Sequence, residues 1–345
     1  MDIMVAPISG EMFPIQIAAL THLSHYGYSD PDLILASSGG VVSSFVAMAS
    51  HWKRNQIYSV CSSLQSSLFV RNWNDDNDNF LPVPVLQYFK GAMYDKSYHT
   101  HDFFESNFTK SSIQKCEVWI GAINSISGAA GLFCTKSRRK SVITSKTTNS
   151  LIYREKLKYL NGSLNQICLA SMASSCVPSL FEPVVIDRNS YIDGGTKYGS
   201  PLTPLYDELE EISGPIHITY LNGHNVDDTV HTVSKSSDSN MMDVWNTVSK
   251  HVIRGTISSD RLCARNIIQH SCSGTMHYQC YDISKLSHVL NARQHAKASL
   301  VEIYPTRPNP INLTKFTGDD LIRKVKDNSN HLGIRVWWKG HPNLI

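Results

Sequence analysis

The stretch that decides the fold is Asp32-Leu33-Ile34-Leu35-Ala36-Ser37-Ser38-Gly39-Gly40-Val41-Val42. The continuous apolar run at residues 33–35 predicts a buried strand of an interior sheet. After the Ser-Ser-Gly-Gly segment, apolar side chains at positions 41, 42, 45, 46 and 48 have the spacing of one helix face. The sequence therefore predicts a tight turn that leads from a strand directly into a helix.

A serine on such a turn forms the nucleophile elbow, which is usually written G-x-S-x-G. The pentapeptide here is Ala36-Ser37-Ser38-Gly39-Gly40, so Ser38 is the candidate nucleophile and Ala36 replaces the first glycine. Small residues flank the serine because the strand and the helix approach each other closely there. The same pattern also suits a phosphate-binding turn at a helix N-terminus, or close packing alone.

The composition describes a globular chain with enough apolar material for a core. The 345 residues carry 41% hydrophobic and 18% charged side chains and a net charge of +3, which is too small to indicate a nucleic-acid partner. The chain shows no signal peptide and no apolar run long enough to span a bilayer. We therefore expect an intracellular, cytoplasmic protein.

The eight cysteines contain no C-x-x-C pair and are expected to be reduced thiols. One group of possible metal ligands follows no standard zinc spacing, and we expect no metal and no cofactor. Its members are Cys263, His270, Cys272, His277 and Cys280.

The elements around the elbow alternate between strands and helices. Ile3–Ile8 predicts a first strand, Ser9-Gly10-Glu11 a turn, and Phe13–His25 a helix that leads to the strand before Ser38. A β-α-β-α order is typical of an α/β protein with a mainly parallel central sheet and helices on both faces. We expect one continuous domain over residues 1–345, with a helical insert at about 52–110 as a possible lid.

The later elements are predicted from the same patterns. Strands are expected at Cys116–Ile123, Gly131–Thr135, Ser190–Ile192, Pro215–Leu221 and Ser299–Tyr304. Helices are expected at 165–175, Pro201–Leu209, Met241–Ile268 (with possible breaks at Gly255 and Ser258) and Asp319–His331, while Val336–Trp338 is left unplaced.

A second motif lies 155 residues after the serine. Asp193-Gly194-Gly195 follows the strand Ser190–Ile192, and it is preceded by a small-residue segment that ends in Val177-Pro178 and by Phe181-Glu182-Pro183. Together with the Ser9-Gly10 turn and the Ser38 elbow, these motifs occur in the order found in patatin-like phospholipases, a family of lipid acyl hydrolases that the chain resembles. The resemblance covers about residues 3–222, and residues 223–345 match it loosely.

The resemblance implies a three-layer α/β/α fold and hydrolysis of glycerolipid acyl esters of the phospholipase A type. Ser38 would be the nucleophile and Asp193 the general base, without an intervening histidine. The backbone N–H groups of Gly10 and Glu11 would form the oxyanion hole. Five small residues would support the two motifs: Ala36, Gly39, Gly40, Gly194 and Gly195.

Glycerophospholipid is the expected substrate, with neutral glycerolipid second, and the protein is expected to contact a membrane surface transiently. The basic run Lys136–Lys140 is interpreted as a solvated loop, with contact to headgroup phosphates as the alternative. Several large side chains of the insert belong either to the core or to an acyl-chain site. They are Leu86, Tyr88, Phe103, Phe104 and Phe108.

Two other hypotheses compete with the enzyme. The Ser9–Met12 turn contains one glycine and no basic residue, whereas the family's loop carries several glycines and an Arg or Lys. This difference supports a catalytically silent module that binds a lipid or a protein. A nucleotide-binding turn at Ser37–Gly40 is the third hypothesis, but neither G-x-G-x-x-G nor a Walker lysine is present.

Overall fold

The computed structural model describes residues 1–68, 70–71, 95–96, 100–113, 115–143, 155, 157–178, 180–212, 214–224 and 241–340. Its centre is a sheet in which five neighbouring strands, β12-β10-β1-β2-β5, run parallel. Antiparallel β13 and β11 extend this sheet beyond β12, and β6 extends it beyond β5. The fold is therefore α/β with a mostly parallel sheet, as predicted.

The strands of the described chain are β1 (Asp2–Ala6), β2 (Leu33–Ser37), β3 (Val70–Arg71), β4 (Asp95–Lys96), β5 (Glu117–Asn124), β6 (Ala130–Cys134), β7 (Lys158–Tyr159), β8 (Val184–Ile186), β9 (Asn189–Asp193), β10 (Ile216–Leu221), β11 (Met276–Asp282), β12 (Ala298–Pro305) and β13 (Leu332–Lys339). The helices are α1 (Phe13–His25), α2 (Gly39–Ala49), α3 (Arg54–Ser62), α5 (Thr100–Asn107), α6 (Lys110–Ile113), α7 (Leu164–Ser174), α8 (Tyr206–Glu210), α9 (Met241–His270), α10 (Leu286–Arg293) and α11 (Gly318–Ser329).

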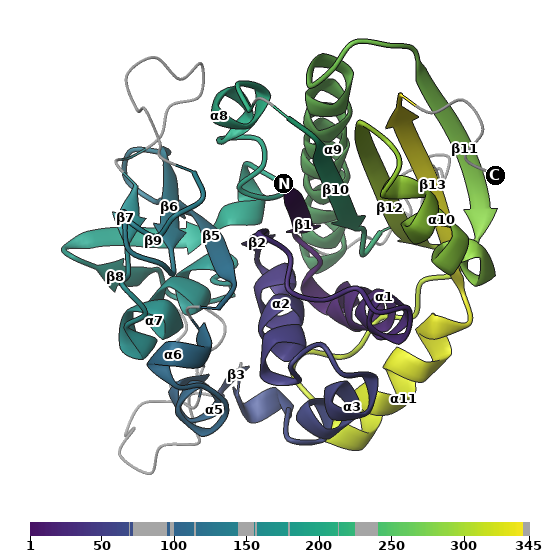
Figure 1. The fold of residues 1–345 in the computed structure, drawn as a ribbon. Helices are drawn as coiled ribbons and strands as arrows, with labels where there is room; N and C mark the ends of the chain where they lie inside the picture. The colour runs from purple at the N-terminus through teal and green to yellow at the C-terminus, as the bar shows by residue number, and fades with distance from the viewer. Residues whose placement is uncertain are drawn as a thin grey trace, which may run out of the picture.

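Helices cover both faces of the sheet, with α1, α2, α3 and α11 on one side and α8 and α9 on the other (Figure 1). The two faces of β1 show the reason. Met4 and Ala6 pack with α1 and α2 in one apolar cluster, while Ile3 and Val5 pack with α8 and α9 in a second cluster. A parallel strand that is buried on both faces needs continuous apolar sequence, which is what these strands have.

Most predicted elements are present, and the bounds of α1 agree with the prediction. Two predicted helices differ from the structure, and one segment without a prediction is part of a strand. The helix expected at Pro201–Leu209 begins only at Tyr206, because residues 201–205 form turns after the Asp193 motif. The helix α9 continues through Gly255 and Ser258 without a break. The unplaced Val336–Trp338 segment lies in β13, which pairs with β12 and β11.

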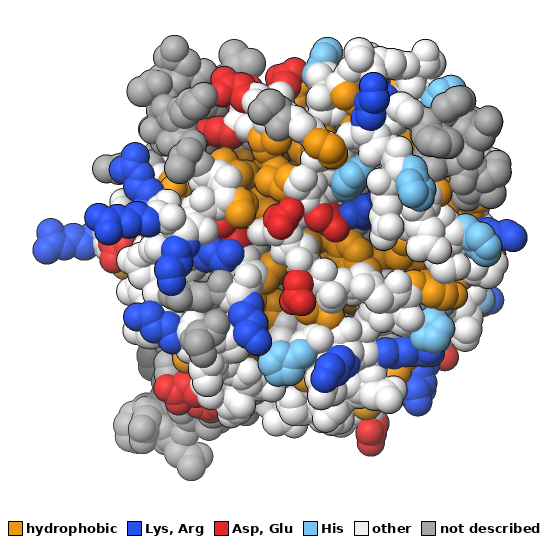
Figure 2. All heavy atoms as spheres, in the orientation of Figure 1, with side chains coloured by type: hydrophobic (Ala, Val, Ile, Leu, Met, Phe, Trp, Pro, Cys, Tyr) orange, Lys and Arg blue, Asp and Glu red, His pale blue; other side chains and the backbone are white. Residues whose placement is uncertain are grey.

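Basic side chains on the described surface are relevant to the expected contact with a membrane. Figure 2 shows Lys and Arg side chains gathered over the end of the sheet that β6–β9 form. The predicted basic loop belongs to this end, because Lys136–Lys140 directly follows β6. In the part of the chain that the structure describes, no helix combines the length and the apolar content that crossing a bilayer requires.

Candidate active site

The two predicted motifs meet end to end along one edge of β5. Strand β2 runs parallel to β5, and its last residue, Ser37, pairs with Gly121. Strand β9 runs antiparallel to β5, and its last residue, Asp193, pairs with the next residue, Ala122. Strand β6 pairs with residues 119–123 of β5, a stretch that also pairs with β2 and β9. Because a strand has two edges, β6 occupies one edge of β5, and β2 and β9 share the other. The ends of β2 and β9 therefore face each other.

The turn after β2 has the strained geometry of a nucleophile elbow. Ser38 has φ 54° and ψ −129°, a conformation that costs a non-glycine residue about 1–3 kcal/mol. Helix α2 begins at the next residue, so the positive end of its dipole lies at the serine. At Gly40 only a hydrogen fits, because a Cβ there would lie 1.9 Å from the Ala6 carbonyl oxygen of β1.

The Ser38 hydroxyl donates a hydrogen bond of 2.7 Å to Oδ2 of Asp193. The other carboxylate oxygen, Oδ1, accepts from the Gly195 N–H at 2.7 Å, which fixes the orientation of the carboxylate. Asp193 is fully buried and Ser38 is 3% exposed. A hydroxyl and a carboxylate at this distance can share a proton when the hydroxyl oxygen attacks an ester carbon.

The predicted oxyanion loop lies directly beside the elbow. Residues Gly10–Met12 form one 3-10 turn, and Gly10 has φ +50°. A Cβ on Gly39 would lie 3.0 Å from the Gly10 nitrogen, so these two backbones are in close contact. The first N–H groups of a helical turn have no acceptor within that turn, which leaves Gly10 and Glu11 suited to hold an oxyanion.

The remaining predicted motif residues also lie in the site. Ala36 is buried in β2 and packs within the apolar cluster that contains α2. Gly194 lies against β5, because a Cβ there would meet the Gly121 carbonyl oxygen at 2.4 Å. The structure therefore brings together both motifs and the oxyanion loop.

Ser174 is a supporting residue that the sequence analysis did not identify. Its hydroxyl accepts from the Ser38 N–H at 3.0 Å and donates to the Gly121 carbonyl of β5 at 2.5 Å. It lies at the end of α7, within the small-residue segment that precedes the aspartate motif. Ser174 thus ties the serine turn to the strand along which β2 and β9 meet.

Asp260 of α9 holds the segment that follows the Asp193 motif. Its fully buried carboxylate accepts from the hydroxyls of Ser200 at 2.7 Å, Thr203 at 2.8 Å and Tyr220 at 3.0 Å. Burial raises the pKa of Asp260 to about 6, against the opposing effect of these hydrogen bonds. No motif indicated this contact, because its partners are distant in sequence and meet only in the fold.

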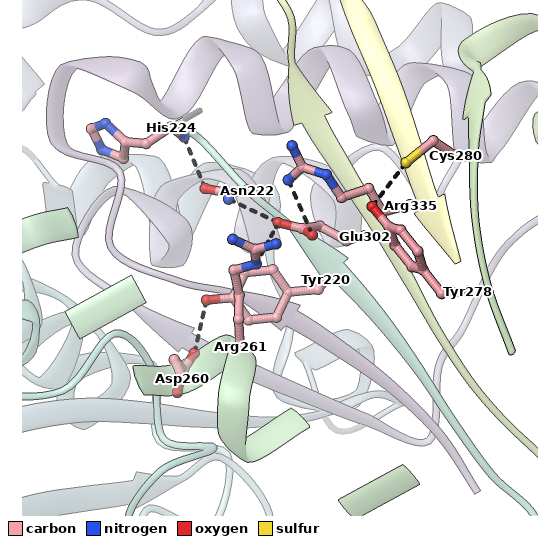
Figure 3. Close-up of polar contacts among 9 residues, drawn as sticks. All are labelled: Tyr220, Asn222, His224, Asp260, Arg261, Tyr278, Cys280, Glu302 and Arg335. Atoms are coloured by element: carbon pink, nitrogen blue, oxygen red, sulfur yellow. Dashed lines mark hydrogen bonds and ion pairs between the residues drawn. The ribbon is translucent and has the colours of Figure 1, made fainter. Parts of the chain in front are cut away.

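A second buried polar cluster, drawn in Figure 3, lies next to the Tyr220–Asp260 contact. Glu302 of β12 forms ion pairs with Arg261 at 3.0 Å and Arg335 at 3.5 Å, and accepts from the Asn222 side chain at 3.0 Å. Asn222 in turn accepts from the His224 N–H at 2.9 Å. Burial, and then the nearby Arg254 cation, lower the pKa of His224 to about 4, so its ring is neutral at pH 7.

This cluster reaches the oxyanion loop. Gly223, between Asn222 and His224, is packed so closely on the loop that a Cβ there would lie 2.9 Å from the Ser9 Cβ. Ser9 itself donates to the buried Gln16 side chain at 3.0 Å, and Gln16 donates to the carbonyls of Pro7 and Leu221. Residues after position 206 therefore support both the oxyanion loop and the aspartate segment.

An apolar pocket opens three residues after Ser38. It is formed by the first turns of α2, by α7 and by residues of the predicted insert at about 52–110. Its lining includes Val41, Val42, Leu68, Phe103, Phe104 and Met172. The enclosed volume of about 30 Å³ holds about two water molecules, so an acyl chain can enter only when lining side chains move.

The aromatic side chains predicted for the insert divide between the core and this pocket. Phe108 is 5% exposed and belongs to the core. Phe104 is 2% exposed and belongs to the core while also lining the pocket. Phe103 is partly buried and lines the pocket. Leu86 and Tyr88 lie outside the described residues. Among the residues that are described, no group of three or more His, Cys, Asp or Glu side chains could hold a metal ion.

The architecture and this site define an α/β protein whose polar residues gather at the carboxyl edge of a parallel sheet. The chain belongs to the patatin-like phospholipase family. The family profile matches residues 10–206, which are more than half of the chain. That range contains Gly10, Ser38 and Asp193, and it ends before Tyr220, Asp260 and Glu302. No curated protein matches the chain. Family membership supports lipid acyl hydrolysis as the class of chemistry.

Proposed function

We propose that this protein is a serine-dependent lipid acyl hydrolase of the phospholipase A type. The observation that carries the proposal is the hydrogen bond of 2.7 Å from the Ser38 hydroxyl to the Asp193 carboxylate, at a strained turn and at the start of a helix. Family membership supports an ester of a glycerolipid as the substrate.

In the proposed mechanism the Ser38 Oγ attacks the ester carbonyl carbon while its proton moves to Asp193. The N–H groups of Gly10 and Glu11 stabilise the negative oxygen of the tetrahedral intermediate, and each such donor lowers a barrier by roughly 3–4 kcal/mol. Collapse of the intermediate leaves an acyl group on Ser38 and releases the alcohol, which takes the proton from Asp193. Water then gives a proton to Asp193 and attacks the acyl-enzyme, which releases the fatty acid and restores the serine.

The apolar pocket is the proposed site of the acyl chain. Val41 and Val42 line it on the helix that begins at the serine, so a chain that extends from the ester carbonyl along this helix enters apolar surroundings. The pocket is narrow in the present conformation. Substrate entry therefore requires displacement of partly buried residues such as Leu68 and Phe103.

The test combines active-site labelling with product analysis. A fluorophosphonate is expected to label the wild type and not Ser38→Ala, and mass spectrometry is expected to detect fatty acid released from mixed phospholipid vesicles only with the wild type. Asp193→Asn should lose release as well. Ser44→Ala is the matched control, because its buried hydroxyl bonds within α2 to the Gly40 carbonyl at 2.8 Å. Release that survives in Asp193→Asn would contradict the proposed base.

The second candidate is a catalytically silent module that binds a lipid or a protein. Two observations favour it: Ser38 is only 3% exposed, and the Ser9–Met12 loop contains one glycine and no basic residue. The same experiment separates the two candidates. Wild-type protein that binds vesicles, takes no fluorophosphonate label and releases no fatty acid would establish the silent module.

A further inference from the structure

A wide groove with both charged and apolar side chains borders the oxyanion loop. It is formed by Glu11, by residues 310–316 after β12, and by Asp320, Arg323 and Lys324 of α11, and we call it the Glu11 groove. Its volume of about 670 Å³ lies in the range typical of small-molecule sites. The apolar pocket, by comparison, measures only about 30 Å³.

The wall of the groove is hydrogen-bonded to the oxyanion loop. The Glu11 carbonyl accepts from the Ile311 N–H at 3.0 Å, which attaches the groove wall to the oxyanion loop. The preceding residue, Gly10, contacts the elbow at Gly39. On the other side, the Ser66 N–H donates to the Phe316 carbonyl at 3.1 Å, so the same wall also touches the segment that lines the apolar pocket.

Three cations line the Glu11 groove. Two of them, Lys315 and Arg323, are exposed and make few polar contacts with the described residues. The side chain of Lys315 is exposed and has no hydrogen bond or ion pair with a described residue. Arg323 pairs with Asp320 at 2.6 Å, but its side chain is 68% exposed, and exposed pairs of this kind contribute little stability. Lys324 donates to the Asn309 side chain. These cations can therefore exchange their present contacts for an anion.

The positions of the two spaces match an amphiphilic ester. The apolar pocket begins at Val41, three residues after Ser38, and the groove begins at Glu11, one residue after Gly10. The pocket thus adjoins the serine turn, and the groove adjoins the oxyanion loop. The groove also contains cations, which the Ser9–Met12 loop does not.

We propose that the Glu11 groove binds the headgroup of a zwitterionic glycerophospholipid. Lys315, Arg323 and Lys324 bind the phosphodiester through charge-assisted hydrogen bonds, while the Glu11 carboxylate faces the ammonium group. The two signs of charge in one groove favour this headgroup over an uncharged glycerolipid. The proposal rests on the proposed hydrolase function, because it assumes that the ester lies at Ser38.

The first test compares two substrates in the full-length protein. Lys315→Gln/Arg323→Gln is expected to lower kcat/KM for phosphatidylcholine, relative to that for the uncharged ester p-nitrophenyl butyrate, about tenfold. Both side chains lie at the surface, so the double variant is expected to fold. The control Lys285→Gln/Lys297→Gln removes the same charge from exposed sites outside the groove. An equal ratio in both double variants would overturn the proposal.

The second test measures binding without catalysis. In Ser38→Ala, glycerophosphocholine is titrated with calorimetry and is expected to bind about tenfold more weakly once Lys315 and Arg323 are also changed to Gln. Inorganic phosphate is titrated in parallel to separate a headgroup site from a free-phosphate site. Phosphate that binds as tightly as glycerophosphocholine, or glycerophosphocholine binding that is indifferent to the substitutions, would overturn the proposal. Because this test does not use the serine, its outcome is independent of whether the protein hydrolyses esters.

Discussion

The Ser174 hydroxyl connects the serine turn to β5 through two hydrogen bonds. We expect Ser174→Ala to lower the free energy of unfolding by about 1–3 kcal/mol, because it leaves the buried Ser38 N–H without its acceptor. It should also reduce ester hydrolysis, since the strained Ser38 backbone loses its attachment to β5. Urea denaturation and kcat for an uncharged ester measure the two effects.

The control for this prediction is Ser44→Ala. Its hydroxyl is also buried, but it bonds to a carbonyl of its own helix, which keeps its helical hydrogen bond when the hydroxyl is removed. Equal losses of stability and activity in Ser174→Ala and Ser44→Ala would contradict a specific role for Ser174.

Asp260 should make stability depend on pH in a defined window. Burial raises its pKa from 3.8 to about 6, so between these values the folded protein keeps a proton that the unfolded chain releases. The free energy of unfolding therefore falls as pH rises through this window, by roughly 3 kcal/mol at about 1.4 kcal/mol per pKa unit. The loss is complete about one pH unit above the folded-state pKa, near pH 7.

The comparison with Asp260→Asn isolates this effect, because all other titrating groups remain. Urea denaturation from pH 4 to pH 7 should show wild-type stability falling relative to that of the variant. Parallel stability curves for the two proteins would show that Asp260 does not titrate in this window.

The two glycines Gly40 and Gly255 lie in helices but differ in their surroundings. A Cβ at Gly40 would collide with the β1 backbone, whereas a Cβ at Gly255 of α9 would meet nothing within 4 Å. We expect Gly40→Ala to destabilise the protein by several kcal/mol or to prevent folding. We expect Gly255→Ala to stabilise it by about 0.5–1 kcal/mol, as alanine does inside a helix.

Thermal unfolding followed by circular dichroism measures both changes. A rise in Tm for Gly255→Ala together with a fall for Gly40→Ala is the expected pair of results. A fall in both would indicate that α9 needs the conformational freedom of glycine at position 255.

The elements that carry a strong local pattern could be predicted from the sequence, and the others could not. Helix α1 has an apolar face and a proline in its first turn, and its predicted bounds agree with the structure. A break was expected at Gly255, yet the helix continues, because α9 packs on β12 and β13 and this packing outweighs the cost of one glycine. Strand β11 was missed because it is mostly exposed and its sequence, with Gln279 and Cys280, lacks regular alternation.

Some residues of the candidate site could also be predicted from local sequence, and others could not. Ser38 and Gly10 follow strands, Asp193 ends one, and all three belong to short motifs, so the sequence could indicate them. Ser174 and Asp260 could not be recognised, because a hydroxyl or a carboxylate gains its role here only from partners that are remote in sequence. The end-to-end meeting of β2 and β9 also depends on register along β5, which local patterns do not encode.

The whole sheet depends on strands from both parts of the chain. The family match ends at residue 206, but β1 pairs with β10 through Asp2–Val5, and β10 pairs with β12. Helix α11 packs on α1 and α3, on the face that carries the apolar pocket. Without the later residues, β1 becomes an edge strand and both core clusters lose much of their apolar contact.

We therefore expect residues 1–206 alone not to fold, even though they contain Ser38, Asp193 and the oxyanion loop. Removal of the rest also removes the acceptor for Ser200 and Thr203 and the Gly223 contact with Ser9, so both supports of the site are lost together. The fragment should show no cooperative transition in urea and no fluorophosphonate label. The control co-expresses residues 1–224 with 225–345, which keeps every described element and should restore both signals. A cooperative transition in the 1–206 fragment would show instead that the family-matched part folds independently and that the strands after residue 206 are not needed for its fold.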